Sequence, residues 1–254
     1  MKTFLAMLHR DAHVARRNFI FTLLQTLLQP MLLVFVFGRV MTASQFMPMQ
    51  YKTLLLPGII ALSMILAGVQ SVAMPLISEF QFTREIEDRL LAPMEIEWLA
   101  VEKVIAGMIQ SLVAGLVVLP SAWLIMGSGV NVTLGHPFAF LAIALLVGIV
   151  AASVGLTLGC SVGQTQIGLM FSLVLAPMIF FGCTYYPWSA LATFPILSKV
   201  VLANPVVYAS EGFRSTLAPQ FPHLPEWSIF VGLTVSAALF FLFGLRQFRK
   251  KAVI

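Results

Sequence analysis

The chain has 254 residues, of which 59% are hydrophobic and 10% are charged, and its formal net charge is +5. Soluble domains carry about 25% charged residues, so the composition excludes an ordinary soluble protein and predicts an all-α integral membrane protein. The positive charge does not indicate nucleic-acid binding, because Lys and Arg gather at the ends of apolar segments, as in membrane proteins.

Residues 1–18 are predicted to form an amphipathic helix at the membrane interface. Phe4 and Leu8 can face lipid, whereas Arg10 and Arg16 can face water and lipid headgroups. The apolar run is short, so a cleaved signal peptide is not expected here.

Six apolar segments are predicted to cross the membrane as helices in one transmembrane domain, residues 1–254. We expect the third to break near Pro120, and the fourth to let a neighbouring helix approach at Gly155, Gly159 and Gly163. The predicted spans are residues 19–41, 54–80, 98–126, 137–162, 167–186 and 227–245.

The segment from Glu79 to Lys103 holds seven of the chain's ten acidic residues, and apolar runs flank it. Such a charged loop must lie in water. Within it, residues 83–93 are predicted to form a short helix with i,i+4 ion pairs and one apolar edge. That helix could dock on a partner protein or lie on the membrane surface. Its residues of interest are Arg84, Glu85, Ile86, Glu87, Asp88, Arg89, Leu90 and Leu91.

Prolines divide the segment between the fifth and sixth spans into pieces too short to cross a bilayer. Residues 189–217 are therefore predicted to form two short helices that enter the membrane from outside and return, with a corner at Asn204. Glu211 and Arg214, three residues apart, can neutralise each other there.

Six spans place both termini on the same side of the membrane. With the termini inside, the cytoplasmic segments hold eleven Lys and Arg residues and the outer segments hold four. The positive-inside rule then places the termini and the charged loop in the cytoplasm. Aromatic residues near the outer span ends agree with this orientation: Tyr51, Trp123, Tyr185, Tyr186, Trp188 and Trp227.

Motifs for chemistry are sparse. The sequence lacks a Gly-x-x-x-x-Gly-Lys-[Ser/Thr] phosphate loop, so we do not expect the chain to bind ATP by that motif. His9 and His13 could share a metal ion, but no third ligand is nearby, so no metal site is predicted. Cys160 and Cys183 lie in or beside predicted spans, and we expect buried thiols.

Uncharged polar residues enter the predicted spans at similar depths, roughly 9 to 18 Å above the inner ends at about 1.5 Å per residue. They could line an inward-facing vestibule on a translocation path, or they could form hydrogen bonds between helices. The residues are Gln25, Gln29, Gln70 and Gln110.

Several short motifs occur in a recognisable order along the chain. They are Leu56-Pro57-Gly58, Leu90-Leu91-Ala92-Pro93, Phe181-Gly182, Tyr186-Pro187 and Asn204-Pro205, followed by Tyr208, Glu211 and Arg214. In this order the chain resembles the ABC-2 type permease family, in the exporter group that includes daunorubicin-resistance and nodulation-factor permeases.

The resemblance implies an interface helix at residues 1–18, a coupling helix at 83–93 that docks on an ATPase, and re-entrant helices at 189–217. It implies two permease copies, expected to be a homodimer, and two ATPase subunits that hold ATP and Mg²⁺. Asp88-Arg89 departs from the Gly-Thr pair of many members, which suggests a docking surface specific to its own ATPase. The outer gate is predicted at Tyr185, Tyr186, Trp188, Asn204, Tyr208, Glu211 and Arg214.

We therefore expect a non-catalytic permease subunit in the bacterial cytoplasmic membrane, contacting lipid and no nucleic acid. It would export a hydrophobic or amphiphilic substrate such as a drug, a lipid or a lipid-linked glycan. An importer's membrane component, a membrane-embedded lipid-modifying enzyme and an assembly subunit remain open alternatives.

Overall fold

The computed structural model describes residues 28–81, 96–127 and 134–252, and these residues form helices without any strand. The fold of these residues is therefore all-α, as the predicted helical spans imply. The interface helix predicted at 1–18 and the coupling helix predicted at 83–93 lie outside the described residues.

Among the described residues, four helices are long and apolar enough to cross a membrane, as expected of a membrane protein. Even a helix of 25 residues extends about 37 Å, more than the ~30 Å hydrocarbon layer. They overlap the second, third, fourth and last predicted spans: α4 (Tyr51–Gln81), α6 (Ile96–Met126), α7 (Pro137–Ser161) and α12 (Glu226–Ala252).

Two shorter apolar helices, Leu28–Ala43 and Ile167–Phe180, overlap the first and fifth predicted spans. The described part of the chain therefore has four helices of spanning length, and the count of six stays a prediction. Both shorter helices contain π-helical turns: the first contains η1 (Val34–Val40) and α3 (Met41–Ala43), and the second contains α8 (Ile167–Leu169), η3 (Met170–Leu175) and α9 (Ala176–Phe180).

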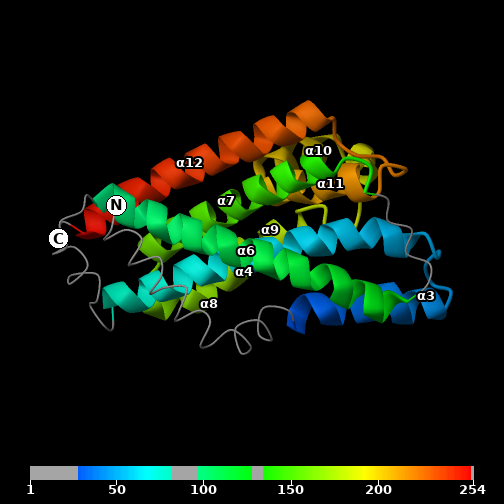
Figure 1. Ribbon diagram of the computed structural model, residues 1–254, viewed down its shortest axis with the longest axis horizontal. Helices are drawn as coiled ribbons and strands as arrows, with labels where there is room; N and C mark the ends of the chain where they lie inside the picture. Colours follow the sequence, from blue (N-terminus) through cyan, green and yellow to red (C-terminus); the bar gives the residue numbers. More distant parts are fainter. Residues whose placement is uncertain (1–27, 82–95, 128–133, 253–254) are drawn as a thin grey trace.

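Helix α7 lies at the centre of the bundle, packed against α4, α6, α11 and α12 (Figure 1). Gly155 and Gly159 allow this packing: an added Cβ would lie 2.8 Å from the Val69 carbonyl oxygen and 3.0 Å from the Ala73 Cα. The predicted close approach is confirmed at these two glycines, whereas Gly163 lies beyond the end of α7.

Helix α6 continues through Pro120, so the predicted break is wrong. Proline removes only one backbone hydrogen bond, and the buried residues Val118 and Ala122 on either side of it hold the helix in place.

Short helices follow α9. They are η4 (Trp188–Thr193), α10 (Pro195–Val200), η5 (Val201–Ala203) and α11 (Pro205–Leu217). Asn204 caps α11, because its side-chain oxygen accepts the Val206 N–H at 3.1 Å. Pro205 at the first helical position suits that start, since its missing N–H would have had no partner within the helix.

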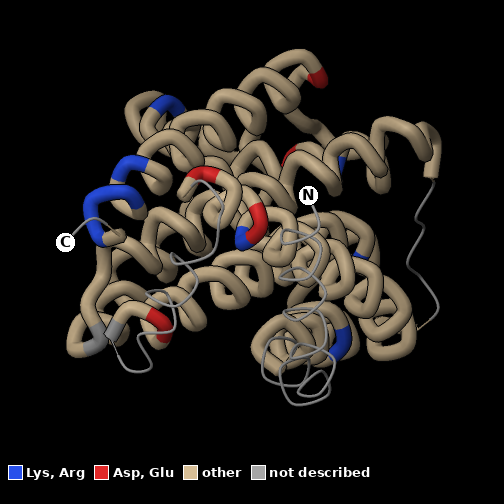
Figure 2. Tube along the Cα trace, turned by 60° about the vertical axis from the view of Figure 1, so that its left-hand side comes forward, with Lys and Arg blue, Asp and Glu red and all other residues tan. Residues whose placement is uncertain are grey.

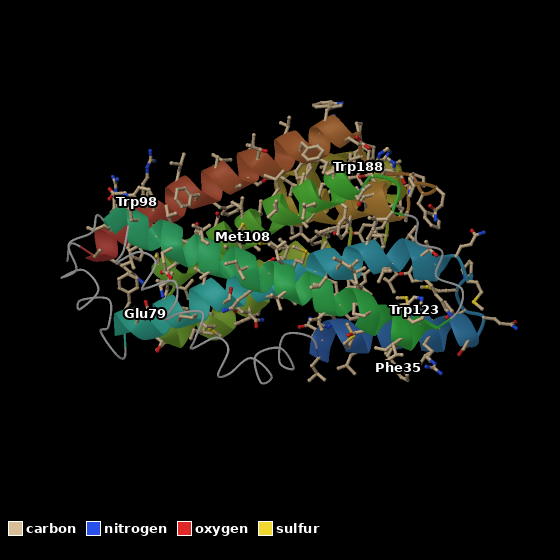
Figure 3. The ribbon with its side chains drawn as sticks, in the orientation of Figure 1. Phe35, Glu79, Trp98, Met108, Trp123 and Trp188 are labelled. Atoms are coloured by element: carbon tan, nitrogen blue, oxygen red, sulfur yellow. The ribbon has the colours of Figure 1, made fainter. Side chains whose placement is uncertain are left out.

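The bundle has two polar ends and an apolar middle. Figure 2 shows that most of the helical length carries no charged residue. We call the end where α4 finishes and α6 begins the loop end; Glu79 and Trp98 lie there (Figure 3). We call the other end, where α4 begins and α6 finishes, the far end; Trp123 and Trp188 lie there.

Candidate functional site

The residues predicted to couple the chain to an ATPase lie outside the described residues, as does Gln25. They are Arg84, Glu85, Ile86, Glu87, Asp88, Arg89, Leu90 and Leu91. The two ends of the charged segment Glu79–Lys103 belong to helices, since α4 ends at Gln81 and α6 begins at Ile96, and "charged loop" here means residues 82–95 between them. The structure shows what holds these two helices.

A buried ion pair joins α4 and α6 at the loop end. Lys103 Nζ lies 2.8 Å from Glu79 Oε1, and the two side chains are 5% and 10% exposed. A second ion pair, Glu97 with Arg249, joins α6 to α12 and is exposed. The ends that flank the charged loop are thus fastened to each other and to the last helix.

The other residues of the predicted translocation path are described, but no hydrogen bond joins Gln29, Gln70 and Gln110 to one another within the described chain. Gln29 is exposed, and the other two are half-buried. The polar contact between helices at this depth comes from Ser111, whose hydroxyl donates to the Met64 carbonyl at 2.9 Å. Whether the glutamines line a path stays a prediction.

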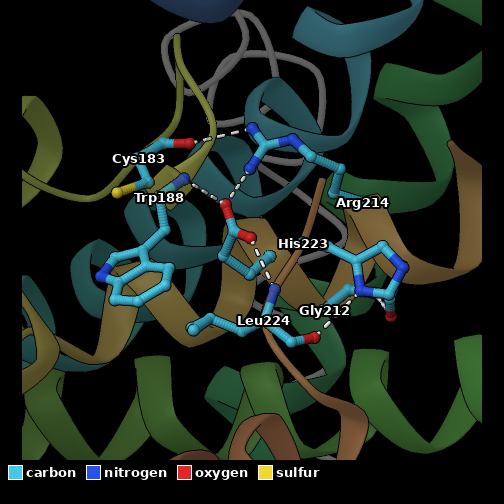
Figure 4. A network of polar contacts seen from close by, with 8 residues as sticks. Cys183, Trp188, Gly212, Arg214, His223 and Leu224 are labelled. Carbon is cyan, nitrogen blue, oxygen red and sulfur yellow. Dashed lines mark hydrogen bonds and ion pairs between the residues drawn. The ribbon is translucent and has the colours of Figure 1, made fainter. Parts of the chain in front are cut away.

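At the far end, the carboxylate of Glu211 forms the centre of a buried polar network (Figure 4). Its Oε1 accepts the Trp188 backbone N–H at 2.9 Å, and its Oε2 accepts the Leu224 backbone N–H at 3.0 Å. Oε1 also pairs with the Arg214 guanidinium, as the spacing of the two residues predicts. Both side chains of the pair are fully buried.

Arg214 extends the network to the segment that follows α9. Its Nη2 donates to the Cys183 carbonyl at 3.0 Å (Figure 4). Cys183 has a φ of +54°, which turns the chain sharply at this point. Glu211 and Arg214 therefore tie together three segments that are separate in the sequence: residues 183–188, α11, and the loop before α12.

The remaining predicted gate residues lie around this network and are half-buried. The Tyr51 hydroxyl on α4 donates to the Tyr185 carbonyl at 2.9 Å. The Trp188 indole N–H donates to the Ser198 carbonyl, and the Tyr186 hydroxyl donates to the Phe180 carbonyl. Each of these hydrogen bonds runs from an aromatic side chain to a backbone carbonyl, and the Tyr185 ring also packs against Phe37 and Phe180.

Asn204 and Tyr208 fasten α11 to its neighbours. The Asn204 side-chain amide donates to the Met178 carbonyl at 2.7 Å, which links the start of α11 to α9. The Tyr208 ring lies against Gly232 of α12, where an added Cβ would come within 2.5 Å of ring carbons. The structure thus brings the predicted gate residues together on α11 and the segment after α9.

Sequence reasoning missed two contributors to this end. Gly58 lies where α4 meets Thr184, since an added Cβ would come within 1.8 Å of the Thr184 carbonyl oxygen. Lys52 is 6% exposed, and its Nζ donates to the Met126 carbonyl at 3.0 Å. Gly58 belongs to the Leu56-Pro57-Gly58 motif, which could have indicated a close contact at this glycine. Lys52 entered the sequence analysis only through the count of positive charges on each side of the membrane.

Other chemistry is limited in the described residues. They contain no group of three His, Cys, Asp or Glu side chains that could hold a metal ion. Cys160 and Cys183 are free and buried, which confirms the predicted buried thiols.

Comparison with known protein families gives a match that covers most of the chain. A model of the ABC-2 type transporter family matches residues 2–218. No curated protein matches the chain by sequence. The matched region contains the charged loop, all the helices from Leu28 to α11, and the Glu211–Arg214 pair.

Proposed function

The chain belongs to the ABC-2 type transporter family, and we propose that it is the permease subunit of an ATP-binding-cassette exporter. The family match over residues 2–218 carries this proposal, and the four long apolar helices support it. The chain is a membrane-embedded transporter component, and an ATPase partner is implied by the family.

In the proposed mechanism, two separate ATPase subunits bind ATP with Mg²⁺ and close on each other. Each presses on the coupling helix at residues 83–93 of one permease copy. The apolar edge of Ile86 and Leu90 would seat in the ATPase, with the charges of residues 84–89 around it. The Glu79–Lys103 ion pair supports this step, because it fastens α4 to α6 where they leave the loop.

Helix α4 can carry the movement to the far end. It is one continuous helix of 31 residues, from Gln81 beside the charged loop to Tyr51 beside the predicted gate. At that end the Tyr51 hydroxyl bonds to the Tyr185 backbone, and Gly58 contacts Thr184. A shift of α4 therefore acts directly on residues 184–185, without an intervening flexible segment.

The proposed gate is the segment of Tyr185, Tyr186 and Trp188 together with the re-entrant helices of residues 189–217. Its fixed point is the Glu211–Arg214 network, which holds Trp188 and Cys183 by their backbones. We place this gate on the outer side of the bacterial cytoplasmic membrane, with both termini and the charged loop inside.

The proposed substrate is hydrophobic or amphiphilic: a drug, a lipid or a lipid-linked glycan. The long helices are strongly apolar, and their charged residues lie near the ends (Figure 2), which does not suit a small ion. Gln25, Gln29, Gln70 and Gln110 are the proposed polar lining of the path, shared between two copies of the chain.

Charge reversal in the coupling helix tests the docking step. The ATPase to use is the one encoded beside this gene, recognised by its phosphate-loop motif. Glu87→Lys and Asp88→Lys should each reduce co-purification of that ATPase at least fivefold while membrane insertion is unchanged. Glu226→Lys is the matched control, since Glu226 is an exposed acid at the start of α12. Equal recovery of the ATPase with all three variants would contradict the docking assignment.

The direction of transport and the orientation of the chain in the membrane are tested separately. A purified complex in vesicles should move a fluorescent amphiphile in one direction only when ATP is supplied on the ATPase side. A cysteine placed at position 87 should react with a membrane-impermeant maleimide only after the cells are opened. Background labelling should be low, because both native cysteines are buried. Labelling of intact cells would invert the proposed topology.

A further inference from the structure

We propose that a basic cavity at the far end binds the phosphate group of an anionic phospholipid. The cavity lies between the end of α3, the start of α4 and the end of α6, and its volume is about 450 Å³. The residues that matter for the argument are Arg39, Met49, Lys52, Leu124, Met126 and Gly127.

Lys52 supplies the first reason to expect an anion. Only 6% of the residue is exposed, and its one hydrogen bond to a described residue goes to the Met126 carbonyl. Burying an ammonium group without an opposite charge is costly. In the described parts of the chain no carboxylate forms an ion pair with Lys52 or with Arg39, which lines the same cavity.

The end of α6 accounts for only part of the positive charge. Gly127 has a φ of +67° and ends the helix, so the last carbonyls of α6 point toward the cavity residues. Lys52 donates to the Met126 carbonyl and Arg39 donates to the Ile125 carbonyl at 3.4 Å. The C-terminal end of a helix such as α6 carries about half an elementary negative charge. Two cations therefore leave a positive excess of about one and a half charges in the cavity.

The donors that remain suit a phosphate group. The Lys52 ammonium has two N–H groups beyond the one used by Met126, and the Arg39 guanidinium has four beyond the one used by Ile125. A guanidinium can hold two phosphate oxygens at once, while an ammonium adds a point charge.

The surroundings favour a lipid as the source of the phosphate. Leu124 lines the cavity and is 75% exposed, and Leu116, two turns earlier on the same face of α6, is 70% exposed. Trp123, at the same end, is 64% exposed, as is common at the level of lipid headgroups (Figure 3). A lipid with its phosphate on Arg39 and Lys52 could lay an acyl chain along this apolar face.

Lipid titration of the purified full chain tests the proposal. Native mass spectrometry would measure the apparent dissociation constant for dioctanoyl phosphatidylglycerol, with dioctanoyl phosphatidylcholine and inorganic phosphate as competitors. We expect phosphatidylglycerol to bind at least tenfold more tightly than phosphatidylcholine. Arg39→Gln and Lys52→Gln should each weaken it at least tenfold, and Lys199→Gln should change it less than twofold. Lys199 is an exposed lysine of α10, outside the cavity.

Arg39→Gln decides the outcome if the buried Lys52 variant does not fold, because Arg39 is exposed. Unchanged phosphatidylglycerol affinity in Arg39→Gln would overturn the proposal. Displacement of the lipid by an equal concentration of inorganic phosphate would also overturn it, since the site would then take the free ion. Failure here would leave the proposed transport function untouched, because the cavity is distinct from the coupling loop and the Glu211 network.

Discussion

Replacing Glu211 with Gln should destabilise the protein by breaking the buried polar network at the far end. The variant leaves the Arg214 guanidinium, which is fully buried, without its anion. It also leaves one side-chain oxygen where the carboxylate used two, so the Trp188 and Leu224 N–H groups can no longer both be satisfied. Breaking a buried ion pair on one side costs about 3–5 kcal/mol.

The matching change in apparent melting temperature is about 6–20 °C, since 1 kcal/mol corresponds to about 2–4 °C in a protein of this size. Size-exclusion chromatography of detergent-purified protein after heating would measure it. Glu226→Gln, which removes an exposed carboxylate at the same end, is the control and should shift the midpoint by less than 2 °C, on the order of a surface substitution.

The double variant Glu211→Gln with Arg214→Met separates charge from packing. It removes both partners, so its loss should be smaller than the sum of the two single losses by about 1–3 kcal/mol. A Glu211→Gln variant as stable as the control, or a double variant with fully additive losses, would refute the view that this network is held by its buried charge.

Two other predictions rest on contacts of α4. Gly58→Ala should destabilise the protein by about 1–3 kcal/mol or more in the same heating assay, because the new Cβ would collide with the Thr184 carbonyl. Gly168→Ala is the control: an added Cβ there has nothing within 4 Å, so this variant should be neutral or stabilising. Lys103→Met should cost about 3 kcal/mol by breaking the buried pair with Glu79, and exchanging the two charges should restore most of it. Arg249→Met, which breaks an exposed pair, should cost less than about 1 kcal/mol, and a larger loss than Lys103→Met would contradict this ranking.

Hydropathy alone predicted the membrane class, because the long helices each contain an 18-residue stretch that is strongly apolar and nearly free of charge. The Asn204-Pro205 corner was also predictable, since asparagine suits the cap and proline suits the first turn, and the structure confirms both. The i,i+3 pairing of Glu211 with Arg214 followed from spacing in the same way. In each case the signal is local in sequence.

The rest depends on contacts between distant segments. Glu211 bonds to the backbone N–H groups of Trp188 and Leu224, and a backbone group carries no trace in the sequence. The end of α9 was missed as well: mostly apolar residues continue to Tyr186, and Gly182, a residue type common after a helix end, was included in the predicted span. Pro120 misled in the opposite direction, since local propensity argued for a break that packing prevents.

The network also constrains how a gate at the far end could open. Separating Glu211 from Trp188, Leu224 and Arg214 would break three hydrogen bonds to a charged group, at about 1.5–3 kcal/mol each. Moving residues 183–188, α11 and Leu224 together leaves all three intact. The opposing surface, where Tyr51 and Gly58 of α4 meet residues 184–185, is held by one neutral hydrogen bond and by packing. α4 also packs against α11, so the unit is expected to follow α4 as one body rather than to come apart internally, where three hydrogen bonds to a charged group would break.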